Sequence, residues 1–200
     1  MKFSIVIAIL AIFIITGCTN DSLVITDPSP EEIQRIMPAA KQVSQELLLA
    51  LKTELQSAIA TGGFEEAIAV CNLKAIPVSK IVEQSSSSVI RVKRTTSQYR
   101  NPFNAPDEIE KLALGYFQNL MVKNEPLPDN YIQKVSHADS AWYYFFKPIK
   151  MDILCLGCHG KPENIDPDVW NRIKELYPED KATGYEEGDF RGLVSVIIRE

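Results

Sequence analysis

The sequence has few histidines and cysteines and no excess of basic residues. Its 200 residues include two histidines and four cysteines, and 21 Lys and Arg residues stand against 26 Asp and Glu, for a net charge of −5. This acidic balance argues against binding of nucleic acid through a general basic surface. Apolar residues make up 46% and charged residues 24%, which excludes a wholly disordered chain. No internal repeat is present, and the length favours one domain with a sizeable core.

The first twenty residues contain a long apolar run. Lys2 precedes an almost wholly apolar stretch at residues 3–15, which is shorter than the roughly 20 residues that a membrane span needs. The following Ile15-Thr16-Gly17-Cys18 resembles the lipobox of bacterial lipoproteins. The resemblance implies a signal peptide at 1–17, lipidation of Cys18 and a tether at 18–30. The alternative is an ordinary N-terminal anchor that happens to contain Cys18.

The lipoprotein resemblance also implies a location. It predicts an exported protein, held on the lipid membrane by acylated Cys18 and facing the periplasm. Thr19 rather than an aspartate follows the cysteine, which favours the outer membrane in a cell with two membranes. The tether then leads to one domain at 31–200.

The rest of the chain predicts helices first and then strands scattered among helices. Ser29 and Glu32 form a capping box at a helix start. We expect Pro38 to kink or interrupt this helix, and Gly62-Gly63 to end it. This order predicts an α+β fold with an antiparallel sheet. Further helices are expected at 64–73, 77–84, 107–121 and 166–176, and strands at 89–95, 142–149 and 191–199. The inward face of the 107–121 helix is predicted to comprise Ile109, Leu112, Ala113, Tyr116, Phe117 and Leu120.

One motif carries chemistry, Cys155-Leu156-Gly157-Cys158-His159. This C-x-x-C-H spacing is the signature of covalent haem c, because two thiols three positions apart can add to the two vinyl groups of one porphyrin edge. His159 can then bind the iron through its imidazole. Haem c attachment requires export, which the N-terminal segment indicates independently. The alternatives are a thioredoxin-like redox pair, half a zinc site or a disulfide, but neither a βαβ frame nor the other half of a zinc site accompanies the motif.

The residues alone leave the second axial ligand of this iron open. Met151 is too near Cys155 in sequence to reach the far face easily, and His137 lies in a polar stretch expected to be an exposed loop. Cys71 lies on the apolar face of a helix and has no disulfide partner once the lipid and the porphyrin take the other thiols. A buried structural thiol is the simpler interpretation of Cys71, but ligation to iron would protect it from oxidation. The candidates are Cys71, His137, Met37, Met121 and Met151, or none.

Several segments together resemble the bacterial PAS-like c-type haem domains, a family long described as a domain of unknown function. Its members are lipoproteins, periplasmic proteins and sensory modules of membrane receptors. The resemblance implies a PAS-like antiparallel sheet with N-terminal helices packed against it. It also implies that His159 and the thiolate of Cys71 are the two axial ligands. The matching pieces lie within about residues 38–198 and read AIAVC (67–71), RTT (94–96), RNPFNAPD (100–107), KPI (147–149), CLGCHG (155–160) and DKATGYEEGDFRG (180–192).

Basic residues near these segments are candidates for binding the haem propionates. A guanidinium group pairs with a carboxylate through two parallel hydrogen bonds. Arg94 and Arg100 lie beside the matching segments and are predicted to bind the propionates. Arg91 and Lys93 are expected on a solvated face of the 89–95 strand. Further residues expected to line the pocket are Tyr185 and Arg191.

Two functions fit these features. The first is a membrane-tethered redox or small-ligand haem sensor, in which a gas such as NO or CO displaces the thiolate and a partner protein receives the signal. The second is a monohaem electron carrier whose acidic surface steers basic redox partners. An enzyme is not predicted, because no distal acid–base pair accompanies the motif apart from His137. A peroxidase-like activity is the weaker alternative.

Overall fold

The computed structural model describes residues 22–199. The predicted signal peptide, Cys18 and the first part of the predicted tether lie outside these residues. Five strands form one antiparallel sheet in the order β1-β3-β4-β5-β2, packed with helices, so the predicted α+β class is confirmed. The strands are β1 Val24–Thr26, β2 Val89–Thr95, β3 Tyr131–His137, β4 Ser140–Lys150 and β5 Phe190–Arg199. The helices are α1 Pro30–Glu83, α2 Glu108–Val122, α3 Leu156–His159 and α4 Pro167–Leu176.

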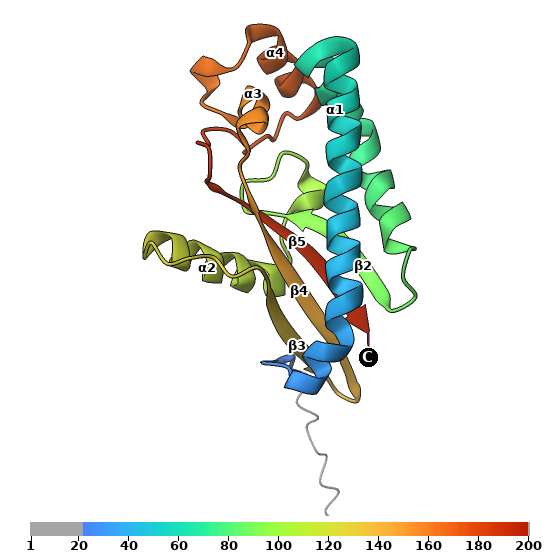
Figure 1. Ribbon diagram of the computed structural model, residues 1–200. Helices are drawn as coiled ribbons and strands as arrows, with labels where there is room; N and C mark the ends of the chain where they lie inside the picture. The colour runs from blue at the N-terminus through green and yellow to red at the C-terminus, as the bar shows by residue number, and fades with distance from the viewer. Residues whose placement is uncertain (1–21, 200) are drawn as a thin grey trace, which may run out of the picture.

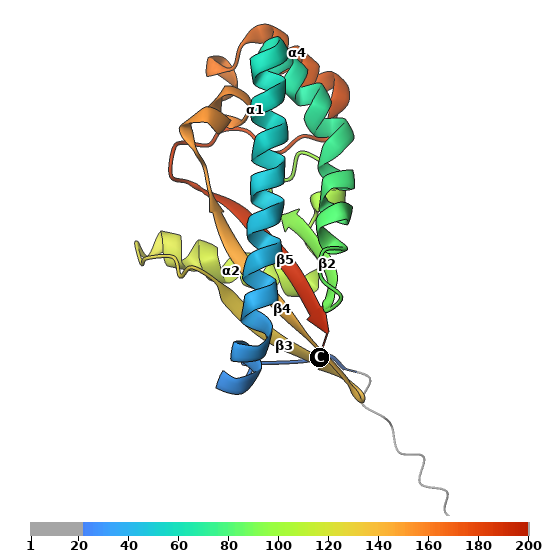
Figure 2. The same cartoon turned by 45° about the vertical axis from the view of Figure 1, so that its right-hand side comes forward.

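Helix α1 folds back on itself as two arms (Figures 1 and 2). Its start is the predicted capping box, with Glu32 N donating to Ser29 Oγ at 3.2 Å and Ser29 N donating to Glu32 Oε2 at 2.7 Å. The arms meet at Gly62 and Gly63, and the φ of 72° at Gly63 is a left-handed conformation that favours glycine. The glycine pair therefore ends the first arm, as predicted. Within residues 22–199, no helix has both the length and the apolar character needed to cross a membrane.

Pro38 does not interrupt α1, so the predicted division into two short helices at this residue is wrong. Only Gly62 and Gly63 depart from helical backbone angles within α1. A proline removes one amide donor and crowds the carbonyl four residues earlier. The helix continues because Ile36 and Ala40, on either side of the proline, are buried in the core against the sheet.

The sheet separates two cores. Leu47 of α1 and Phe145 of β4 belong to the core on one face, and Phe117 of α2 and Phe146 of β4 belong to the core on the other. Successive residues of β4 therefore point into opposite cores, as expected for a strand that is covered on both faces. Figure 2 shows α1 crossing in front of the sheet. Helix α2 extends to the left from behind it.

Helix α2 is rotated relative to its predicted inward face. Ile109, Ala113 and Phe117 are buried as predicted, but Leu112 is 55% exposed. The carboxylate-bearing Glu110 occupies an inner position instead. A hydrophobic stripe read from the sequence cannot anticipate a buried charge, because such a charge depends on partners elsewhere in the chain.

Strand β2 supplies those partners. Lys93 Nζ lies 2.8 Å from Glu110 Oε2, and Arg91 Nη2 lies 2.6 Å from Asp107 Oδ2. The side chains of Lys93 and Glu110 are 16% and 0% exposed. Arg91 and Lys93 therefore bind the first turn of α2 to the sheet and do not form the predicted solvated face.

Strand β3 is missing from the sequence prediction, which places His137 in an exposed loop. His137 ends β3 and pairs with Ser140 across the hairpin to β4. The alternation of β3 is masked because the polar Gln133 is buried beside Ile132. Strand β1 pairs with β3, so residues 24–26 of the segment expected as a tether belong to the sheet.

We predict that Glu32→Gln lowers the stability of the fold and weakens its dependence on acid. Hydrogen bonds from Lys134, the Ser29 amide and Tyr143 lower the pKa of Glu32 from 4.5 to about 2. A carboxylate with a lowered folded-state pKa contributes its full stabilisation above its unfolded pKa and loses it as the pH falls through the folded value. The difference between wild type and variant in free energy of unfolding should therefore be full above pH 4.5 and shrink toward pH 2. Urea titrations across this range measure it, with the exposed Glu125→Gln as control. A difference that stays constant with pH would contradict the assignment.

Candidate functional site

The C-x-x-C-H motif lies in the segment that connects β4 to β5, residues 151–189, here called the cap. Both ends of the cap meet at the sheet, where Met151 N donates to Asp189 O at 2.8 Å and Gly188 N donates to Met151 O at 2.9 Å. A 3-10 turn, η2 (Ile153–Cys155), leads directly into α3. Residues three apart on a helical turn share one side, so Cys155 and Cys158 are neighbours there. In Figure 1 the cap lies beside the turn between the two arms of α1, far from the β3–β4 hairpin.

An apolar cluster joins the cap to the second arm of α1. Ile68 of this arm belongs to one core cluster with Cys158 of the motif and Ile173 of α4. Phe64, at the start of the same arm, lies against Gly157, where an added Cβ would come within 2.8 Å of the aromatic ring. The motif therefore rests directly on α1, and the small residue inside it permits this close approach.

His159 is held in one tautomer. Its Nδ1 lies 2.6 Å from the carbonyl oxygen of Ala182, and because a carbonyl can only accept, Nδ1 carries the proton. Burial holds the pKa of His159 well below its usual range, and the positive charges of Arg100 and Arg191 act in the same direction. The ring is therefore neutral at pH 7, and its Nε2 carries the free lone pair that a metal ligand needs.

Arg100, in the loop after β2, connects the motif to the segment after α4. Its Nε and Nη2 donate to Asp180 Oδ1 and Oδ2 at 3.2 and 3.1 Å. Nη2 also donates to the Cys158 carbonyl at 2.6 Å and to the Ala182 carbonyl at 3.4 Å. The guanidinium predicted to bind a propionate is thus hydrogen-bonded mainly within the protein.

Cys71 reaches the site from the second arm of α1. Burial raises the pKa of its half-buried thiol, while the charges of Arg94 and Arg100 oppose that rise. Burial also raises the pKa of Cys158 to about 11, and the charges of Cys71 and Cys155 act on it as well. The three thiols are therefore electrostatic neighbours, and all three are free in the structure. The fold thus brings Cys71 to the motif from a distant part of the sequence.

Arg94 places an unpaired positive charge in the same region. Burial lowers the pKa of this guanidinium, and the charges of Cys71, Tyr177 and Cys155 act in the opposite direction. Among residues 22–199, no side chain or carbonyl pairs with it by a hydrogen bond or an ion pair. A half-buried cation in this state is suited to an anionic group of a ligand.

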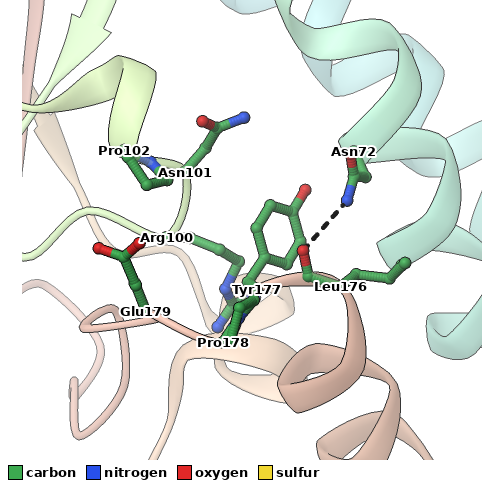
Figure 3. Close-up of a pocket in the computed structure, with 8 residues that line it drawn as sticks. All are labelled: Asn72, Arg100, Asn101, Pro102, Leu176, Tyr177, Pro178 and Glu179. Atoms are coloured by element: carbon green, nitrogen blue, oxygen red, sulfur yellow. Dashed lines mark hydrogen bonds between the residues drawn. The ribbon is translucent and has the colours of Figure 1, made fainter.

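Two hollows border the site. One of about 120 Å³ lies between Asn72, next to Cys71, and the segment after α4. Figure 3 shows the Tyr177 ring beside Arg100 in this hollow, with Asn72 donating to the Leu176 carbonyl at 3.4 Å. The other, about 390 Å³, lies against the motif itself, and this volume falls within the range of small-molecule pockets. Its lining comprises Leu156, Gly157, Gly160, Lys161, Asn164, Tyr185, Glu186 and Glu187.

The other ligand candidates lie elsewhere. Strand β4 has 11 residues and separates His137 from the cap by about 33 Å at a rise of ~3.3 Å per residue. Met37 packs against the core below α1, and Met121 lies at the end of α2 with 37% exposure. Met151 is buried at the base of the cap. Within residues 22–199, no group of three or more His, Cys, Asp or Glu side chains could hold a metal ion.

The sequence analysis missed the residues that fix His159. Ala182 accepts the imidazole proton through its backbone carbonyl, and Asp180 binds both the Ala182 amide and Arg100. The only sequence signal for these two residues was that they belong to the matching segment 180–192. Of the two residues expected to line the pocket, Tyr185 lines the hollow against the motif, whereas Arg191 lines neither hollow. The Tyr185 ring is edge-on to His159 with centroids 6.5 Å apart, and the Arg191 guanidinium lies 5.2 Å from the Tyr185 ring centre.

Fold and site together define an α+β protein whose C-x-x-C-H cap presents one free imidazole nitrogen beside a third thiol. The Tll0287-like family model matches residues 28–199, and the chain belongs to this family. The chain is similar to a solved structure, that of the cyanobacterial haem protein Tll0287. The two share 26% identity at a TM-score of 0.56, over 86% of this chain and 98% of that one. No curated protein matches the chain.

Proposed function

We propose that this chain carries one covalent haem c, with Cys155 and Cys158 as thioether residues and His159 as an axial ligand. The single observation that carries the proposal is the His159–Ala182 hydrogen bond, which occupies Nδ1 and leaves Nε2 as the free ring nitrogen of the residue that follows Cys158. Each thiol adds its S–H across a vinyl group, so that sulfur bonds to one carbon and hydrogen to the other, with no net oxidation. The haem, when bound, supplies a one-electron ferric–ferrous couple. Similarity to a protein described as a haem protein supports the same conclusion.

We further propose Cys71 as the second axial ligand. Its thiol is the one candidate that α1 brings to the motif from a distant part of the sequence, and Arg94, which has no carboxylate partner among residues 22–199, provides positive charge that balances a thiolate. In this proposal Arg94 pairs with a propionate, whereas Arg100 contributes chiefly through its bonds to Asp180 and Cys158. The PAS-like description of the fold remains part of this proposal, supported by the run of neighbouring strands β3-β4-β5-β2.

The role that fits best is a redox or small-ligand sensor rather than an enzyme. If Cys71 holds the iron as proposed, its thiolate would be the ligand that reduction, NO or CO displaces, and a partner protein would read the change. The proposed lipid at Cys18 belongs to the end of the chain that enters at the β1 side, while the site lies at the other end of α1 (Figure 1). Residues 30–61 span about 48 Å at ~1.5 Å per residue, so this arm would hold the site well away from the membrane.

We predict that the exported protein carries one covalent haem and that Cys71→Ala changes the iron ligation. Loss of the thiolate should abolish the low-spin ferric spectrum of a His/Cys pair and raise the reduction potential, because a thiolate stabilises ferric iron. Absorption and EPR spectra of both oxidation states, with and without CO and NO, measure this. His137→Gln, at the far end of the sheet, is the matched control and should leave the spectra unchanged. Wild-type protein without covalent haem would overturn the whole proposal, and an unchanged Cys71→Ala spectrum would overturn the Cys71 assignment alone.

An electron carrier is the second candidate function, and the distribution of charge favours it. Residues 150–190 contain ten acidic and five basic side chains, so this segment alone has the net charge of −5 found for the whole chain. The site therefore lies in the one strongly acidic part of an otherwise balanced protein. Such a field raises the encounter rate of positively charged redox partners at low ionic strength.

We predict that the haem protein exchanges electrons faster with cationic than with anionic reagents. Rates with hexaammineruthenium should fall as salt rises, and rates with ferricyanide should rise, because salt screens both the attraction and the repulsion. Removing two exposed charges of the cap with Glu163→Gln and Glu187→Gln should reduce the difference between the reagents roughly two- to tenfold. The exposed pair Glu125→Gln and Asp129→Asn, outside the cap, is the control. Equal effects of the two pairs would contradict a role for the cap's charge.

A further inference from the structure

We propose that Arg100 and Asp180 are a positioning pair that sets the orientation of His159. The inference rests on the proposed haem function, and it gives Arg100 a role different from propionate binding. Asp180 holds the peptide whose carbonyl accepts the imidazole proton. Arg100 holds both this carboxylate and the carbonyl of the residue before His159.

The first step is the link from Asp180 to the imidazole. Asp180 Oδ1 accepts a hydrogen bond from Ala182 N at 2.9 Å, and the Ala182 carbonyl accepts from His159 Nδ1 at 2.6 Å. The position of one carboxylate oxygen therefore fixes the acceptor that selects the tautomer. A carbonyl that accepts a hydrogen bond from one ring nitrogen orients a ligating imidazole and tunes the basicity of the other nitrogen.

The second step is the link from Arg100 to both sides of His159. Its forked guanidinium grips Asp180 at 3.2 and 3.1 Å, and the same Nη2 donates to the Cys158 carbonyl at 2.6 Å. The backbone entering His159 and the acceptor of its ring are thus tied to one rigid planar group. The side chains of Arg100 and Asp180 are only 11% and 8% exposed, so water competes little for these bonds.

The third step concerns charge. Arg100 and Asp180 neutralise each other, so the pair orients His159 without adding net charge beside it. Removing either partner leaves one unbalanced buried charge near the ligand. A group that served only to hold the cap together would change stability when removed but would not change the electronic state of the iron.

Variants of the haem protein test this proposal. In Asp180→Asn we expect the single low-spin EPR signal to broaden or split, because the imidazole loses its fixed orientation. We also expect the reduction potential to rise, because the charge of Arg100 is left unbalanced. Arg100→Lys keeps the charge but not the fork, and it should leave the EPR signal heterogeneous. The matched control is Arg172→Lys, which alters the exposed Arg172–Glu175 pair of α4 and should change neither readout. Wild-type EPR spectra and potentials in both site variants would overturn the proposal.

A measurement on the wild-type chain tests the proposal even if the variants fail to fold. It also separates this proposal from the haem assignment. Long-range 1H–15N NMR should show His159 protonated at Nδ1, with a proton that exchanges slowly with solvent. His137, the other histidine, is the internal reference. If the chain carries no haem but His159 still shows the protected Nδ1 proton, the haem function fails and the positioning role stands. If the Nδ1 site is unprotonated or exchanges freely, the positioning role fails whatever the haem content.

Discussion

The pairing of β4 with β5 is the constraint on which the site depends. The two strands are hydrogen-bonded neighbours along almost their whole length, so the cap must leave the sheet and return to it at the same point. The bonds between Met151 and residues 188 and 189 close its base. A closed base brings the 180–190 segment alongside the motif, where Gly184 N donates to Gly160 O at 2.8 Å and Tyr185 N to His159 O at 3.1 Å. The two segments run antiparallel here, and this pairing brings the Ala182 carbonyl to the imidazole of His159.

The hairpin of α1 brings the thiol of Cys71, which is distant in sequence, to the cap. An unbroken helix would carry Cys71 beyond the molecule, because its first arm already runs past the whole sheet. The left-handed backbone at Gly63 turns the chain back, and the second arm then lays Phe64 and Ile68 on the cap. Cys71 follows one turn after Ile68, close to its position in the apolar stripe. The proposed ligation therefore depends on the turn at Gly62 and Gly63, because this turn brings Cys71 to the cap.

Sequence reasoning succeeded where the information is local. The capping box of Ser29, the glycine break and the strands of β-branched residues each depend on neighbours within a few positions. It failed where partners come from afar. Glu110 turns inward only because Lys93 neutralises it, and α1 runs through Pro38 only because the flanking turns are buried. The residues next to Asp180 in the sequence do not indicate its proposed role, because that role depends on the ion pair with the distant Arg100.

The buried charges near His159 and the exposed charges of the cap have opposite signs. Inside, Arg94, Arg100 and Arg191 face His159, and Asp180 is the carboxylate that pairs with one of them. At these short distances and low dielectric, the remaining positive charge favours anions such as propionates and a thiolate. Outside, the acidic residues of the cap act through water over a Debye length of about 8–10 Å. The interior can therefore select an anionic cofactor while the surface attracts a cationic partner. Each preference can be altered without the other, because buried charges are screened by salt far less than exposed ones.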